Sequence, residues 1–131
     1  MTDKCTKIDH DCCRSACPIT ATLDIIGDKW TLLIIRDMLF FESKCFNDFI
    51  NASESISTNI LTDRLKKLEK FGIIEKQAYQ EKPTRYAYSL TDAGKSLQPM
   101  ILELMSWGRE HIEGVSTTPP KEVEDFLKRC K

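Results

Sequence analysis

The chain has 131 residues, of which 41% are hydrophobic and 30% are charged, and its formal net charge is −1. This length suits one domain with a core of ordinary size. The longest apolar stretch, 31–41, is interrupted by two charged residues and is too short to span a bilayer. A near-neutral chain lacks bulk attraction for nucleic acid, so such a partner would need a local basic face.

The N-terminus has no apolar run after its first charges, which argues against a signal peptide. Six cysteines without such a signal indicate a reducing compartment, so we expect the protein in the cytoplasm and not at a membrane. Residues 1–16 are polar and rich in cysteine, and we expect this segment to be flexible.

Two helices are predicted to follow this segment. Pro18 suits the first position of a helix over 18–26, which Gly27 ends. Asp28 then suits the N-cap of a second helix over 29–39. The second helix is apolar on nearly all sides, which is typical of a central helix.

Two shorter helices and a hairpin come next. Phe46, Phe49 and Ile50 have the spacing of a short third helix. Ser57 suits the N-cap of a fourth helix, whose leucines recur every three or four residues until Gly72 closes it. Segments 73–79 and 85–90 are predicted strands, joined by the charged tip 80–84.

The last part of the chain is predicted to be helical again. Thr91 suits the N-cap of one long helix over 92–113. The stretch 116–120 breaks the pattern, and apolar spacing predicts a final short helix within 116–131. The resulting fold class is mainly α with a small β-hairpin, which indicates a winged helix-turn-helix domain over 17–115.

The most basic part of the chain lies around the fourth helix. Residues 57–85 carry seven basic and four acidic side chains, whereas 1–56 carry six basic and nine acidic ones. A recognition helix places its N-terminal residues against base edges, where small polar side chains fit. The candidate base contacts there are Ser57, Thr58, Asn59 and Thr62. The candidate phosphate contacts are Lys29, Arg64, Lys66 and Lys67, and the candidate minor-groove contacts near the hairpin tip are Lys82 and Arg85.

The alternative without a binding role is a solvated helix face with ordinary capping. The hairpin directly after the helix favours DNA over this alternative. A winged helix that binds a protein partner stays open as a second alternative, although a basic helix face is unusual for that role.

Several segments together resemble the HxlR-type transcriptional regulators, a MarR-like branch of bacterial winged-helix proteins. These segments are "CPITATLDIIGDKWTLLIIRDML", "ISTNILTDRLKKLEKFGII", "YSLTDAG" and a late "WG". The resemblance covers residues 17–112 and implies a homodimer on a palindromic operator in double-stranded DNA. It favours a repressor, whose inducer is unknown.

In this family the first and last helices form the dimer interface. The resemblance therefore implies interface roles for Ile19, Leu23, Ile26, Leu104, Met105, Trp107 and Ile112. The alternative is that these side chains belong to the core of one subunit.

Cys17 precedes Pro18 and so lies near the N-cap of the first helix, where a thiolate is stabilised. Some HxlR-type members sense oxidants or electrophiles through a cysteine at this place, and the resemblance carries that role to Cys17 alone. Two alternatives stay open: no sensing role, or a metal-responsive site. The candidate metal ligands, whose spacing is not a standard zinc pattern, are Cys5, His10, Cys12, Cys13 and Cys17. Cys45 and Cys130 are more typical of small hydrophobic residues.

An enzyme is not expected. The two histidines, His10 and His111, belong to no recognisable catalytic constellation, and no glycine-rich loop could cradle a phosphate. We accordingly expect neither a cofactor nor a bound metal.

Overall fold

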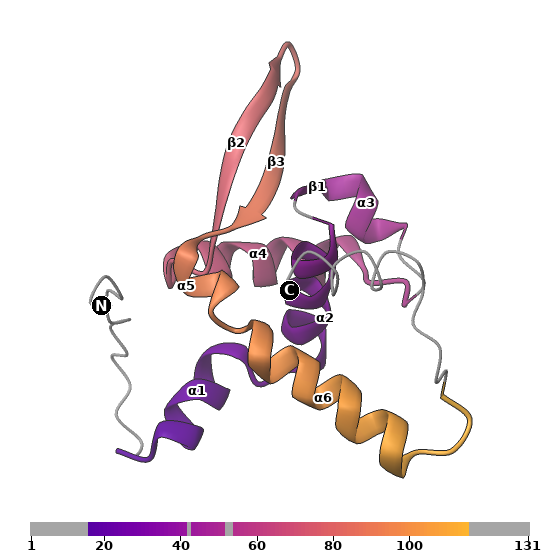
Figure 1. Ribbon diagram of the computed structural model, residues 1–131. Coiled ribbons are helices and arrows are strands. Elements are labelled where there is room, and N and C mark those ends of the chain that lie inside the picture. Colours follow the sequence, from indigo (N-terminus) through magenta and orange to yellow (C-terminus); the bar gives the residue numbers. More distant parts are fainter. Residues whose placement is uncertain (1–15, 42, 52–53, 116–131) are drawn as a thin grey trace.

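The computed structural model describes residues 16–41, 43–51 and 54–115. In chain order, the elements are α1 (Pro18–Ile26), α2 (Lys29–Phe40), β1 (Ser43–Cys45), α3 (Phe46–Ile50), α4 (Thr58–Lys70), β2 (Ile74–Glu81), β3 (Thr84–Leu90), α5 (Asp92–Lys95) and α6 (Gln98–His111). The β2–β3 hairpin projects from the body, and α1 and α6 lie on the side of α2 away from the hairpin tip (Figure 1). The predicted winged helix-turn-helix architecture is confirmed.

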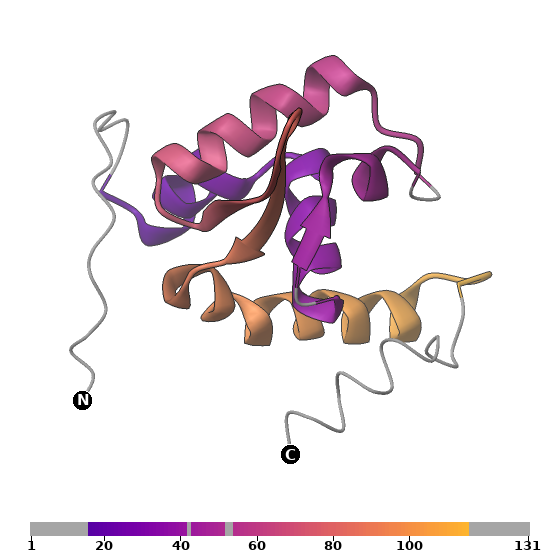
Figure 2. The same cartoon turned by 90° about the horizontal axis from the view of Figure 1, so that it is seen from above.

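Helix α2 is the central element, as its sequence predicts. Ile34, Ile35 and Met38 are buried in the core. Asp28 caps the helix by accepting a hydrogen bond from the backbone N–H of Thr31 at 3.1 Å. Seen from above, α4 and α6 lie on opposite sides of α2, so this helix supports both (Figure 2).

Helix α4 begins and ends where the sequence indicates. Ser57 accepts a hydrogen bond from the N–H of Ile60 at 3.2 Å, and the leucines of the helix are buried. Gly72 adopts φ 74°, a left-handed backbone angle that residues with a side chain rarely adopt. Two hydrogen bonds then close the helix, from Gly72 N–H to the Glu69 carbonyl (3.1 Å) and from Ile73 N–H to the Leu68 carbonyl (2.9 Å).

An ion pair holds the chain just before α4. The Arg36 guanidinium of α2 donates to both carboxylate oxygens of Glu54, at 2.9 and 3.1 Å, and also to the buried Asp37. A bidentate pair of this kind fixes direction as well as distance. The approach to the N-terminus of α4 is therefore tied to the central helix.

The hairpin belongs to a three-stranded antiparallel sheet with the order β1-β3-β2. Ile74 pairs with Leu90, and a bulge interrupts the ladder between Ala78 and Gln80. Lys82 and Pro83 form the turn between the strands. Strand β1 was not predicted, because three residues are too few to show an alternating pattern.

The prediction of one long helix over 92–113 is wrong, since two helices occupy this segment. Thr91 does cap α5, accepting from Gly94 N–H at 3.2 Å, but the helix ends at Lys95. Pro99 lacks the N–H that would continue the ladder and suits the first turn of a new helix, α6. The ladder resumes with a bond from Ile101 N–H to the Leu97 carbonyl at 3.1 Å.

Some predictions concern residues outside the described ranges. These are the flexible segment 1–16, of which only residue 16 is described, the helix within 116–131, and the roles of Cys5, His10, Cys12, Cys13 and Cys130. Within the described ranges, no helix is long and apolar enough to cross a membrane.

Candidate nucleic-acid interface

The N-terminal half of α4 presents polar side chains to solvent. Thr58, Thr62 and Lys66 recur every four residues and so follow one exposed stripe, with Asn59 beside it. Ser57 is also exposed, and its hydroxyl caps the helix. The predicted base contacts therefore share one accessible surface, which we call the α4 polar face and define as Ser57, Thr58, Asn59, Thr62 and Lys66.

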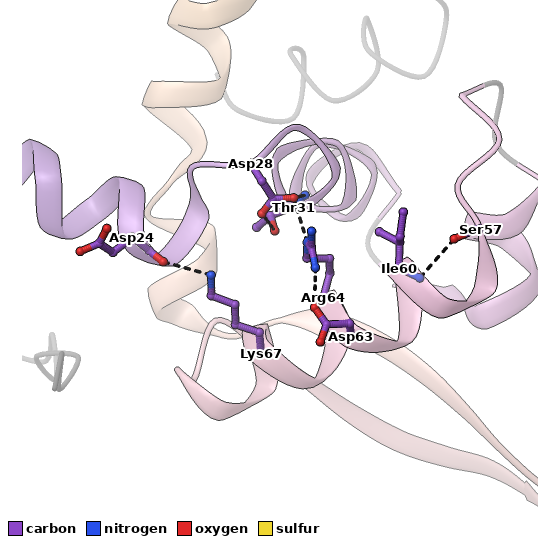
Figure 3. A network of polar contacts seen from close by, with 8 residues as sticks. All are labelled: Asp24, Asp28, Thr31, Ser57, Ile60, Asp63, Arg64 and Lys67. Atoms are coloured by element: carbon purple, nitrogen blue, oxygen red, sulfur yellow. Dashed lines mark hydrogen bonds and ion pairs between the residues drawn. The ribbon is translucent and has the colours of Figure 1, made fainter. Parts of the chain in front are cut away.

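Two of the predicted phosphate contacts lie elsewhere on α4. Nε of Arg64 donates to Oδ2 of Asp28 at 2.9 Å, and Nζ of Lys67 donates to the backbone carbonyl of Asp24 at 3.0 Å (Figure 3). Arg64 also pairs with the neighbouring Asp63. Both cations are half-buried and are bonded toward the α1–α2 corner, so their predicted phosphate contacts are not supported by the directions of these side chains.

Asp28 has a role that the sequence did not reveal. Its carboxylate accepts hydrogen bonds from the Thr31 hydroxyl (2.5 Å) and N–H (3.1 Å) as well as from Arg64. Partial burial raises the pKa of Asp28, but these donors outweigh it and hold the pKa below its usual value. The carboxylate therefore stays ionised and joins α2 to α4.

The remaining predicted DNA contacts are exposed. Lys82 lies in the hairpin turn and Arg85 follows it on β3. Lys29 begins α2, with its ammonium 4.7 Å from the centre of the Trp30 ring. The hairpin also carries Lys76, whose ammonium lies 4.5 Å from the Tyr86 ring. The β2–β3 hairpin, which we call the wing, therefore presents accessible cations, and Lys82 and Arg85 lie near its tip.

A cavity of about 300 Å³ separates the wing from α3. Its lining residues come from the end of β1, the start of α3 and the hairpin, and are Cys45, Phe46, Asn47, Tyr79, Thr84, Arg85, Tyr86 and Tyr88. The pKa of Tyr79 is raised, first by its hydrogen bond with Cys45. Sequence reasoning missed this cavity because its walls come together only in the fold.

Cys17 occupies the N-cap position of α1 and is exposed. The backbone N–H of Thr20 is the main group that lowers the pKa of its thiol, followed by the Thr20 hydroxyl and the N–H of Ile19. These groups belong to the first turn of the helix, where N–H groups lack intrahelical partners. A thiolate at this position is consistent with the predicted sensing role, which stays a prediction.

Large apolar side chains are exposed on α1 and α6. Ile19 is 70% exposed and Trp107 is 58% exposed, and Leu23, Leu104 and Ile112 are also open to solvent. Ile26 does not belong with them, because it is only 3% exposed and lies in the core. Met105 is partly buried against that core as well. The prediction that Ile26 forms an interface is therefore wrong for this residue, since its side chain points inward.

Residues 25–116 match the sequence profile of the family described as "HxlR-like helix-turn-helix". The chain is a member of this family. One relative, the HTH-type transcriptional regulator YybR of Bacillus subtilis (strain 168), is 35% identical over 98 residues, which cover 75% of this chain and 78% of YybR. The matched family is a helix-turn-helix family, and this relative is named as a transcriptional regulator.

Solved structures agree with this assignment. The redox regulator HypR in its oxidised form superposes with a TM-score of 0.68 and 36% identity, covering 74% of this chain and 99% of HypR. A MarR-family transcriptional regulator from Porphyromonas gingivalis W83 gives a TM-score of 0.68 and 34% identity, covering 82% of this chain and all of that one. This HxlR-type protein is thus a MarR-like transcriptional regulator, and a redox regulator is among its structural relatives.

Proposed function

We propose that this protein is a cytoplasmic repressor that binds a palindromic operator as a homodimer and releases it when Cys17 is oxidised. The observation that carries the DNA-binding part is the α4 polar face, exposed beside a projecting wing. In a helix-turn-helix protein this combination fits a helix in the major groove with its N-terminal residues toward the bases.

The exposed side chains suit distinct parts of the duplex. Asn59 can pair with adenine through two hydrogen bonds, and Thr58 and Thr62 are small enough to approach base edges. Lys66 follows one turn later, where the helix meets the phosphate backbone. Lys82 in the wing turn and Arg85 behind it suit a neighbouring minor groove, and Lys29 suits a phosphate.

The homodimer is supported by exposed apolar residues of α1, of α6 and of the C-cap that follows α6. We define this dimer face as Ile19, Leu23, Leu104, Trp107 and Ile112, which would bury large hydrophobic side chains against a second copy. Both helices lie away from the wing tip (Figure 1). A two-fold dimer through this face would present two recognition helices to half-sites about 34 Å apart.

The redox part is supported by the position of Cys17 and by the likeness to HypR, whose structure is described as that of a redox regulator. A peroxide would oxidise the thiolate to a sulfenic acid, with the peroxide reduced to water or an alcohol. A second thiol could then displace water to form a disulfide. Because Ile19 and Leu23 follow Cys17 on α1, either change would act next to the dimer face.

Operator selection from a random duplex pool, in reducing buffer and after treatment with diamide, tests this proposal. We expect a palindrome to be enriched only from the reduced protein, and the Cys17→Ser protein to select it under both conditions. Equal sensitivity of wild type and Cys17→Ser to diamide would refute the sensing role. Failure to select any sequence would refute the DNA-binding role.

A further inference from the structure

We propose that Arg64 and Lys67 are positioning residues that clamp the recognition helix to the α1–α2 corner, and that Lys67 transmits the state of α1 to the DNA-binding surface. This inference deepens the proposed function and rests on it. The two side chains were predicted to contact phosphates, but each is half-buried and bonded within the subunit. Figure 3 shows both reaching from α4 toward the corner.

Lys67 is bonded to the last turn of α1. Its ammonium donates to the Asp24 carbonyl at 3.0 Å. Carbonyls in the last turn of a helix lack intrahelical partners, and the negative end of the helix dipole favours a cation there. This contact joins α4 directly to the helix that begins at Cys17.

Arg64 is bonded to the start of α2 instead. Its partner, Asp28, is also the N-cap of α2 and is held by two hydrogen bonds from Thr31, a residue with no exposed surface. The Arg64 contact is therefore fixed to the central helix and the core. Arg64 and Lys67 lie three residues apart on one flank of α4, so the helix is held at two points by two different elements.

The C-terminal end of α1 leaves no room for a side chain at Gly27 and is anchored in the core. A Cβ atom on Gly27 would lie 2.3 Å from the Leu23 carbonyl oxygen, and the neighbouring Ile25 and Ile26 are buried. Helix α1 has nine residues and is about 14 Å long. A displacement of its Cys17 end would therefore pivot near Gly27 and change the distance between Asp24 and Lys67.

The two clamps should accordingly differ in effect. Loss of the Arg64 contact removes a fixed support, so it should weaken operator binding in the reduced and oxidised proteins alike. Loss of the Lys67 contact removes the link to α1, so it should reduce the difference between the two states. Loss of a phosphate contact would weaken binding in both states without changing the response to oxidation, so a smaller response is the result that distinguishes the Lys67 contact from a phosphate contact.

The test compares Lys67→Met with Lys66→Met, which removes the same charge from the exposed neighbouring position. The operator dissociation constant is measured before and after diamide treatment, and the ratio of the two values reports the response. We expect Lys67→Met to lower this ratio about fivefold or more, and Lys67→Arg to restore the ratio. Lys66→Met should weaken binding in both states and leave the ratio unchanged. Equal behaviour of Lys67→Met and Lys66→Met would overturn the inference.

A second measurement separates failure of the clamp from failure of the proposed function. Amide hydrogen exchange of the DNA-free, reduced protein reports the Lys67 contact without an operator or an oxidant. We expect faster exchange in the last turn of α1 for Lys67→Met than for Lys66→Met. If the wild type bound no operator, the DNA-binding proposal would fail, and unchanged exchange in Lys67→Met would independently overturn the clamp.

Discussion

Asp28 and Arg64 are 36 residues apart in the chain, and their side chains meet at 2.9 Å between Oδ2 and Nε. The same carboxylate caps α2 by bonding Thr31. One residue therefore sets both the start of the central helix and the position of the recognition helix. The orientation of the α4 polar face depends on this shared contact.

Replacement of Asp28 tests this double role. Asp28→Ala removes the N-cap and the partner of Arg64, and we expect a loss of about 1–3 kcal/mol in the free energy of unfolding. Asp28→Asn can still cap the helix, so it should lose less. Urea unfolding of the three proteins measures both effects, and equal losses for the two variants would contradict a stabilising role of the N-cap.

The same residue predicts a pH dependence. Because the pKa of Asp28 is lowered in the folded state, the folded protein binds a proton here less readily than the unfolded chain. This contribution to stability is complete above the unfolded pKa, about 3.9, and is lost as pH falls through the folded value. The stability difference between wild type and Asp28→Asn should therefore shrink below about pH 4, and a difference constant from pH 6 to pH 3 would contradict the assignment.

Substitution of Gly27 should be unfavourable because a side chain has no room there, and not because of the backbone angles of this residue. A methyl group at this position would meet the Leu23 carbonyl oxygen at 2.3 Å, so Gly27→Ala should destabilise the protein by about 1–3 kcal/mol. Gly108→Ala is the matched control, because nothing lies within 4 Å of its Cβ and alanine favours a helix. Thermal unfolding should show a lower midpoint for Gly27→Ala only.

Trp107 tests the proposed dimer face. It is exposed on α6 and stacks on His111 with ring centres 4.6 Å apart. Trp107→Glu would place a charge in an apolar interface, so we expect a shift from dimer to monomer in analytical ultracentrifugation. Glu110→Gln, on the same helix and also exposed, should leave the dimer intact. A wild-type protein that sediments as a monomer would rule out this face as the interface.

Local patterns were enough to predict most of the fold. The leucine spacing of α4, the Ser57 cap and the Gly72 closure all act within one helix, so the sequence contains the whole signal. The break between α5 and α6 was missed because a helix-like pattern continues across Pro99. Strand β1 was missed because it is defined by its partner β3 and not by its own three residues.

The directions of two long side chains at the candidate site could not be predicted from the sequence. Arg64 and Lys67 were grouped with Lys66 because all three are basic and close in sequence. Their half-buried partners, the Asp28 carboxylate and the Asp24 carbonyl, come from elements that only the fold brings near α4. Ile26 was misassigned for a related reason, since α1 is apolar on both its core side and its exposed side.

The central claim is that the α4 polar face reads DNA sequence, and the most direct measurement compares base preference in the wild type and in Asn59→Ala. Operator variants substituted one base pair at a time would be titrated with each protein. We predict that Asn59→Ala loses roughly 1–3 kcal/mol of discrimination at one position in each half-site, whereas Lys66→Ala weakens binding to every variant about equally. An Asn59→Ala protein with wild-type preference at every position would contradict the claim.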